Sequence, residues 1–162
     1  MLLSYNKYNS NYRKSVGIML LNKENKIFIA KRIDSSTYNW QMPQGGINKN
    51  ESPLNAALRE LKEEIGTNNV KVIIEFREWI NYNLPIVLTK KVWNGKYKGQ
   101  HQKWFAMKFL GKTKDINLNT KTQEFTHWKW VNVNKILRNV IPFKKAIYST
   151  LIKKIFPKIK LL

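Results

Sequence analysis

The chain has 162 residues and no cysteine, and its 30 Lys and Arg residues against 10 Asp and Glu residues give it a net charge of +20. This length predicts a single domain over residues 1–162, and the missing cysteines exclude disulfides, thiolate zinc sites and a cysteine nucleophile. His101 and His127 lie far apart in the sequence, which argues against a histidine-rich metal site or a Ser-His-Asp triad. The positive charge favours polyanionic partners, but a composition rich in Lys and Asn also fits the bias of AT-rich codons.

The first residues are polar, and we expect residues 1–11 to be frayed. Apolar runs predict strands at 16–21 and 26–32, separated by a turn at 22–25. Residues 40–46 are expected to be extended and then to form a loop, because Pro43 restricts the backbone of Met42.

The clearest predicted element is a helix at 52–65. Ser52 is a suitable N-cap, Pro53 suits the first helical position and Gly66 is a suitable C-terminal stop. The residues expected to form its apolar face recur at helical spacing and are Leu54, Ala57, Leu58, Leu61 and Ile65.

Beyond this helix we expect a strand-like segment at 70–79, a loop-rich stretch to about residue 99, strands at 103–110 and 125–131, a short helix at 134–140 and a terminal helix from Pro142. This order of elements predicts an α/β or α+β sandwich around a mixed sheet. Residues 143–162 are basic and amphipathic, but packing of Phe143, Ile147, Leu151 and Ile155 on the core is favoured over association with a membrane surface.

No segment approaches the roughly 20 apolar residues that a membrane-spanning helix needs, and the first residues lack an apolar core of secretory length. We therefore expect a cytoplasmic protein with no membrane partner. No sequence feature marks an oligomer interface, so a monomer is expected.

Three acidic residues of the predicted helix, Glu60, Glu63 and Glu64, have the spacing i, i+3 and i+4. This spacing places them on one face, opposite Leu58, Leu61 and Ile65, where like charges repel. A cation outside the protein would relieve the repulsion, because carboxylate oxygens, loop carbonyls and waters are the ligands of a hard divalent ion. The alternative is an acidic surface helix with one local ion pair.

Arg59 is within reach of Glu63 at i+4 and could also lean toward Glu60 or Glu51. A guanidinium in this position would fix the orientation of a carboxylate and keep it ionised.

The acidic run belongs to a longer pattern. Gly45, Glu51 and the run Arg59-Glu60-Leu61-Lys62-Glu63-Glu64-Ile65-Gly66 reproduce the spacing of the Nudix box, here residues 45–67. One departure is Thr67, where the family has a large aliphatic residue, and it affects packing of the loop more than chemistry. The chain therefore resembles the Nudix hydrolases.

Other segments, from about residue 12 to residue 150, resemble the bacterial RNA pyrophosphohydrolase subfamily. These segments are 12–13, 16–18, 40–48, 99–105, 124–130 and 143–144. The resemblance implies an α-β-α sandwich around a mixed sheet. It also implies hydrolysis of the 5′-triphosphate of RNA to the 5′-monophosphate, which exposes transcripts to decay. Diadenosine polyphosphates are the alternative substrate, and a non-catalytic RNA-binding protein on the same scaffold is a remote alternative, since no metal-binding glutamate is lost.

The resemblance also implies the roles of individual residues. Ligands for Mg²⁺ or Mn²⁺ are expected from Glu60, Glu63, Glu64, Glu124 and Gly45, and catalytic roles from Glu63, Glu124 and Arg59. Glu63, Glu124 and a metal-bound hydroxide all remain candidates for the general base. Substrate binding is expected from Arg13, Arg32, Tyr82, Gln100, Lys103, Phe143 and Lys144. Phe143 would stack on the first base and Arg32 over its opposite face, with packing of Phe143 in the core as the alternative.

Overall fold

The computed structural model describes residues 4–5, 9–34 and 40–159. Within these residues a mixed sheet contains β1 (Ser4–Tyr5), β2 (Tyr12–Leu21), β3 (Ile27–Arg32), β4 (Trp40–Gln41), β5 (Gln44–Gly46), β6 (Val70–Glu75), β7 (Ile80–Asn83), β8 (Gly99–Phe109) and β9 (Phe125–Val131). The α-helices are α1 (Pro53–Ile65), α2 (Ile86–Thr89), α3 (Ile136–Asn139) and α4 (Lys145–Ile159). Short 3-10 turns are η1 (Trp93–Gly95), η2 (Thr113–Asp115), η3 (Val133–Lys135) and η4 (Pro142–Lys144).

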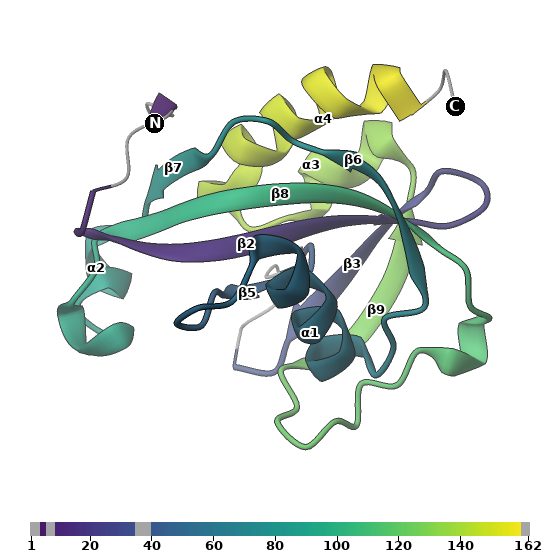
Figure 1. The fold of residues 1–162 in the computed structure, drawn as a ribbon, viewed down its shortest axis with the longest axis horizontal. Coiled ribbons are helices and arrows are strands. Elements are labelled where there is room, and N and C mark those ends of the chain that lie inside the picture. Colours follow the sequence, from purple (N-terminus) through teal and green to yellow (C-terminus); the bar gives the residue numbers. More distant parts are fainter. Residues whose placement is uncertain (1–3, 6–8, 35–39, 160–162) are drawn as a thin grey trace.

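The centre of the sheet is the parallel pair β2 and β8, which stay in register from Tyr12 opposite Gly99 to Leu21 opposite Lys108. β6 and β7 pair antiparallel with the other edge of β8. β3 pairs with β2 only where Leu21 faces Ile27, and it then continues beside β9 and β4. β5 pairs with the first half of β2 instead, so that β2 and β3 diverge with β5 and α1 beside the opening (Figure 1).

Helices cover both faces of this sheet (Figure 1). Alternate residues of β2 point to opposite sides, as the pleat of a strand requires. Val16, Ile18 and Leu20 pack in one buried cluster with residues of α1, whereas Met19 and Leu21 pack in a second cluster with residues of α4. The expected single-domain α-β-α sandwich is confirmed.

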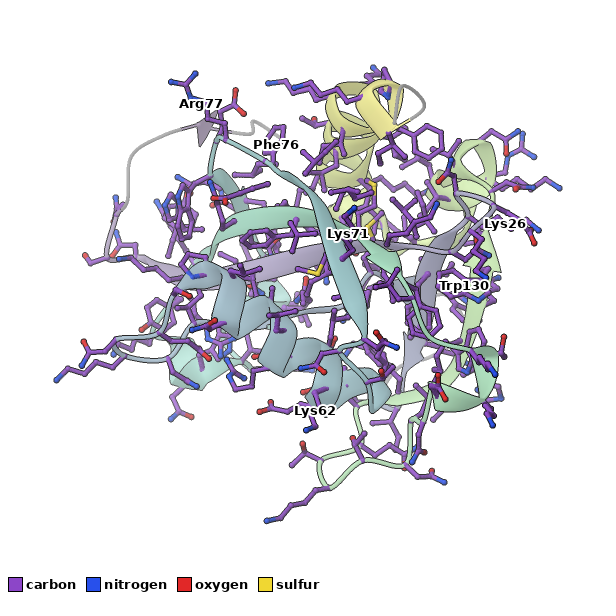
Figure 2. The ribbon with its side chains drawn as sticks, turned by 45° about the vertical axis from the view of Figure 1, so that its right-hand side comes forward. Lys26, Lys62, Lys71, Phe76, Arg77 and Trp130 are labelled. Carbon is purple, nitrogen blue, oxygen red and sulfur yellow. The ribbon has the colours of Figure 1, made fainter. Side chains whose placement is uncertain are left out.

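Helix α1 forms where its capping residues predict it. The Ser52 hydroxyl accepts a hydrogen bond from the Asn55 amide at 3.2 Å, and Gly66 ends the helix in the left-handed region with φ of 79°. Lys62 lies on the exposed side of the helix (Figure 2).

The buried face of α1 differs from the predicted apolar face. Leu54 is 38% exposed, whereas Glu60 and Glu64 are buried beside Leu61 and Ile65, and the three glutamates do not share one face opposite the apolar residues. Glu63 is exposed. The buried face includes the two carboxylates because they point toward β5, where the Gln44 amide donates a hydrogen bond to Glu64.

Several strands are longer than their apolar runs. β2 begins at Tyr12 and β8 at Gly99, and β7 is a separate strand within a stretch expected to be a single strand followed by loop. Most of the added residues are polar and pair through their backbones, so the hydrophobic pattern alone does not reveal these strand segments. The predicted helices at 134–140 and from Pro142 appear as η3 with α3 and as η4 with α4.

The start of the chain also differs from a frayed end, because Ser4 and Tyr5 pair with Asn81 and Ile80 of β7. Residues 1–3 and 6–8 lie outside the described part of the chain. Among the helices that are described, none combines the length and the apolar character needed to cross a bilayer.

Candidate active site

Two buried carboxylates of α1 face the strand β5. Glu64 is 1% exposed, and its Oε2 accepts a hydrogen bond from the Gln44 amide at 3.1 Å. Its Oε1 is buried without a hydrogen-bond partner among the described residues. Glu60 lies against Gly45 so closely that a Cβ at that position would stand 1.8 Å from the Glu60 carboxyl carbon. Only glycine therefore allows the helix and the strand to approach each other here.

Arg59 holds the acidic residues in place. Its Nε and Nη2 donate to the two carboxylate oxygens of Glu51 at 2.8 and 2.9 Å, and Nη2 also donates to the Gly46 carbonyl at 2.7 Å. Its Nη1 donates to Glu60 at 2.9 Å and to Glu63 at 3.2 Å. These contacts lower the pKa of Glu51 and raise the pKa of Arg59. The predicted contacts of Arg59 with Glu51, Glu60 and Glu63 are all present.

Burial makes the charged forms of Glu60 and Glu64 less favourable than those of exposed carboxylates. Burial raises the pKa of Glu64 well above its usual range, and the charges of Glu124 and Glu60 raise it further. Burial also raises the pKa of Glu60, although Arg59 partly offsets this effect. Since the charges of Glu124 and Glu60 both raise the pKa of Glu64, the three carboxylates lie close enough to repel one another.

The donor set is suited to a divalent cation that also takes ligands from substrate. No cluster of three or more Asp, Glu or His side chains in the described part of the chain is drawn together closely enough to hold a metal by itself. Mg²⁺ is commonly held by one or two carboxylates together with waters and substrate phosphates. The unpartnered Oε1 of Glu64 and the nearby carboxylate of Glu60 fit that kind of binding.

A cavity of about 480 Å³ lies beside these acids. Its lining combines cationic, acidic, amide and aromatic side chains with apolar ones. The polar and aromatic groups are Arg13, Arg32, Asp34, Gln41, Gln44, Glu60, Tyr82, Trp93, Gln100, Glu124, Phe143 and Lys144, and the backbone of Gly45 and Gly46 completes one wall.

Lys144 is a buried cation in the cavity wall. It is 3% exposed, and its Nζ donates to Gln41 Oε1 at 2.8 Å and to Gln44 Oε1 at 2.7 Å. Burial, followed by the charge of Arg32, lowers the pKa of Lys144 to about 7. Burial therefore makes the charged form of this side chain far less favourable than that of an exposed lysine.

Two arginines complete the cationic part of the cavity. Arg32 forms two hydrogen bonds of 2.8 Å with Asp34 and an ion pair of 3.4 Å with Glu124. The guanidinium of Arg13 lies over the Trp93 ring, 5.2 Å from its centroid. Each guanidinium is thus held in place by a neighbouring side chain, an arrangement that suits binding of a phosphate.

Aromatic residues form a further part of the wall. The rings of Tyr82 and Phe143 are stacked, with centroids 6.4 Å apart and an interplanar angle of 25°. Tyr82 is 1% exposed, so it supports the wall, whereas Phe143 is only partly buried.

The structure brings most of the predicted site residues to this cavity. Arg13, Arg32, Gly45, Glu60, Tyr82, Gln100, Glu124, Phe143 and Lys144 line it. Glu64 is bonded to the Gln44 amide and is not a lining residue, and neither are Glu63 and Arg59. Arg59 thus holds Glu60 from outside the cavity lining.

Lys103 is the predicted substrate ligand that the structure places elsewhere. Its Nζ forms an ion pair with Glu75 at 2.9 Å and a hydrogen bond to the Arg77 carbonyl at 3.1 Å. Successive residues of a strand point to opposite faces. Since Gln100 of the same strand points into the cavity, Lys103, three positions later, points away from it.

Sequence reasoning missed several lining residues. Gln41 and Gln44 position Lys144, and Asp34 positions Arg32, but neutral amides and a lone aspartate give no distinctive pattern. Leu88, Val92 and Trp93 come from the stretch expected to be rich in loops. The signal that marks this stretch is the alternation of lysines with aromatic residues from Lys90 to Lys98.

Comparisons with known proteins agree with this geometry. The family model described as the NUDIX domain matches residues 11–151. The chain is 52% identical over 150 residues to the RNA pyrophosphohydrolase of Wolbachia pipientis subsp. Culex pipiens (strain wPip), covering 92% of each chain. It is 46% identical over 151 residues to the RNA pyrophosphohydrolase of Rickettsia prowazekii (strain Madrid E), covering 93% of this chain and 94% of the relative. In fold it is similar to the dihydroneopterin triphosphate pyrophosphohydrolase of E. coli, with a TM-score of 0.68, 15% identity and coverage of 90% and 98%.

Proposed function

This chain belongs to the NUDIX family and hydrolyses pyrophosphate bonds, and from that premise we propose that it is an RNA 5′-pyrophosphohydrolase that converts the 5′-triphosphate of RNA to a 5′-monophosphate. The observation that carries the proposal is the cavity in which Arg13, Arg32 and Lys144 face Glu60 and Glu124. Relatives named RNA pyrophosphohydrolase match nearly the whole chain at about half identity, which supports RNA as the substrate.

A divalent cation, Mg²⁺ or Mn²⁺, fits the acidic side of this cavity. We assign Glu60 and Glu64 as its principal protein ligands, with Glu124, Glu63 and the backbone of Gly45 as further candidates. When bound, such an ion polarises phosphate oxygens and lowers the pKa of a nearby water. Orientation of Glu60 depends on Arg59, which bonds its Oε1 at 2.9 Å.

The cations of the cavity have a separate task. Arg13, Arg32 and Lys144 would bind the negatively charged phosphate chain, and Phe143 presents a partly exposed ring for the first base. Arg32 serves this purpose while paired with Asp34, which fixes the plane of its guanidinium.

Glu124 is the better-placed general base. It lines the cavity with a side chain that is 44% exposed, so a carboxylate oxygen can take a proton from a water that enters with the substrate. Glu63 is instead bonded to Arg59 and does not line the cavity.

The test compares triphosphorylated RNA with diadenosine tetraphosphate as substrates of the purified protein in the presence of Mg²⁺ or Mn²⁺. We expect a higher kcat/KM for RNA, with 5′-monophosphate RNA as product, measured from released phosphate or pyrophosphate and from the RNA end. The Glu64→Gln variant should lose about a hundredfold or more in kcat, because it removes a charge that holds the cation.

The matched control is Glu24→Gln, which neutralises an exposed glutamate that pairs with Lys26. It should retain the activity of the unmodified protein. Faster turnover of diadenosine tetraphosphate would instead identify a dinucleoside polyphosphate hydrolase, and normal activity of Glu64→Gln would contradict the assignment of the metal ligands.

A further inference from the structure

The connection between β7 and β8 forms a distinct projection, residues 84–98, which we call the β7–β8 arm. It contains α2 and η1, and it extends from one end of the central strands (Figure 1). Its base is closed by backbone hydrogen bonds of 2.9 Å from Leu84 to Lys98 and from Lys98 to Asn11. The arm is thus anchored to both β7 and the chain that leads into β2.

The arm forms part of the cavity. Leu88, Val92 and Trp93 line it, and the Trp93 ring lies against Arg13. Trp93 and Asn94 both have left-handed backbones, with φ of 50° and 53°. A bulky residue in this region carries a conformational cost, and such strain is concentrated at functional sites. Because Trp93 lies against Arg13, the surface of the arm adjoins the side of the cavity that we assign to phosphate binding.

The surface of the arm has the chemistry of a single-stranded nucleic-acid binder. The sequence has no acidic residue between Glu78 and Asp115. Lys90, Lys91, Lys96 and Lys98 of the arm are exposed, and none of the ion pairs found among the described residues involves them.

Aromatic rings lie between these lysines. Trp93 and Tyr97 meet edge to face with centroids 6.0 Å apart, and the Lys96 ammonium is 5.3 Å from the Tyr97 centroid. Proteins bind single strands by combining a basic track for the phosphates with aromatic platforms for the bases. Both components occur here on one short projection.

We propose that the β7–β8 arm binds the single-stranded RNA that follows the triphosphorylated 5′ end, with Trp93 as a stacking platform and Lys90 and Lys91 contacting backbone phosphates. This inference rests on the proposed function, because it takes the same RNA as substrate. The arm should therefore increase the affinity for a long RNA, but not for a short substrate that fits within the cavity.

The test measures binding without divalent cations, so that no hydrolysis is needed. The probe is an unstructured triphosphorylated RNA dodecamer with a 3′ fluorophore, followed by fluorescence anisotropy, and a triphosphorylated dinucleotide serves as the short competitor. The Lys90→Gln/Lys91→Gln variant should raise the Kd of the dodecamer about tenfold and reduce the slope of log Kd against log salt by about 0.7 for each lysine. Its affinity for the dinucleotide should not change.

The matched control is Lys71→Gln/Lys153→Gln, which removes the same charge from two exposed lysines outside the arm, on β6 and α4 (Figure 2 labels Lys71). It should bind the dodecamer like the unmodified protein. Equal losses in both double variants would mean that only net charge matters and would overturn the proposal, as would an unchanged Kd in the arm variant.

The aromatic component is tested by a second pair of variants. Trp93→Ala should weaken dodecamer binding about tenfold, whereas Trp93→Phe should keep most of the affinity, because a phenyl ring also stacks on a base. Normal binding by Trp93→Ala would overturn the stacking role. These measurements do not involve turnover, so they succeed or fail separately from the hydrolysis experiment that tests the proposed function.

Discussion

At the scale of single residues, two ionisable side chains of the site, Lys144 and Glu64, are removed from water and hydrogen-bonded to neutral partners. Lys144 is bonded only to the amide oxygens of Gln41 and Gln44 in the contacts described above. An amide dipole stabilises an ammonium less than a carboxylate does, so burial dominates and the pKa falls to about 7.

This shift predicts how stability depends on pH. An unfolded lysine has a pKa of about 10.4, so between about pH 7 and pH 10 the unfolded chain binds more protons at Lys144 than the folded chain does. The contribution of Lys144 to the free energy of unfolding must therefore rise with pH across that window. Lys144→Met should be more thermostable than the unmodified protein near neutral pH, and the difference in Tm should shrink toward pH 10. A difference that stays constant with pH would contradict the assignment.

Replacing Glu64 by Gln should raise the stability of the protein without a cation while it lowers the activity. Its buried, unpartnered oxygen destabilises the fold without a cation, and Glu64→Gln removes the charge while an amide oxygen can still accept from the Gln44 amide. We expect the variant to have a higher Tm than the unmodified protein in a chelator. Adding Mg²⁺ or Mn²⁺ should raise the Tm of the unmodified protein and have a smaller effect on the variant, measured by thermal denaturation. An equal response to the ions would place their binding elsewhere.

At the scale of elements, α1 shows how local signals fix a helix that the site requires. Its first turn is closed by the Ser52 hydroxyl and its last by Gly66, whose added Cβ would lie 2.9 Å from the Asn117 carbonyl oxygen. Both ends are thus defined within a few residues of sequence, and they set where Glu60 and Glu64 stand along β5.

The caps predict the effects of two substitutions. Ser52→Ala should lower the free energy of unfolding by about 1 kcal/mol, because the Asn55 amide loses its acceptor. Gly66→Ala should cost more, since it combines a left-handed backbone with the close approach to Asn117. Urea denaturation measures both, with Ser10→Ala at an exposed position as the control. A larger loss in Ser10→Ala than in Ser52→Ala would contradict the capping role.

Features set by local periodicity and caps were predictable from the sequence, whereas features set by contacts between distant segments were not. Helix α1 and the strands with apolar runs follow from local periodicity and caps, and the spacing from Gly45 to Gly66 indicates the acidic side of the site. The burial of Glu60 and Glu64 was not predictable from periodicity, because it depends on the polar groups of β5 that meet them. Lys103 was misplaced because a motif match does not reveal which face of a strand a residue occupies.

At the scale of the whole molecule, the net charge of +20 is spread over a small sandwich with few acidic residues. Most of the ion pairs in the described part of the chain gather around Arg59 and Arg32 in the region of the site. The rest of the surface therefore experiences repulsion between like charges, which disfavours the compact state.

Screening of this repulsion predicts an unusual effect of salt. The Debye length falls from about 30 Å at 0.01 M to about 8 Å at 0.15 M ionic strength, so repulsion between lysines across the molecule weakens. The Tm at neutral pH should rise as NaCl is added over this range, measured by differential scanning calorimetry. A falling Tm would mean that ion pairs contribute more to stability than repulsion removes.

The pairing of β5 with β2 has a consequence for how this enzyme can diverge. Gly45 and Gly46 belong to the sheet and not to a free loop, because they pair with Val16 and Ser15 of β2. Changes to this wall of the cavity would consequently disturb the pairing of β5 with β2. The rim, made by the β7–β8 arm and the segment before β9 that carries Glu124, lies outside this strand pairing. Mutations accumulating along the rim are therefore the accessible route by which descendants of this chain acquire new preferences while the hydrolytic apparatus stays intact.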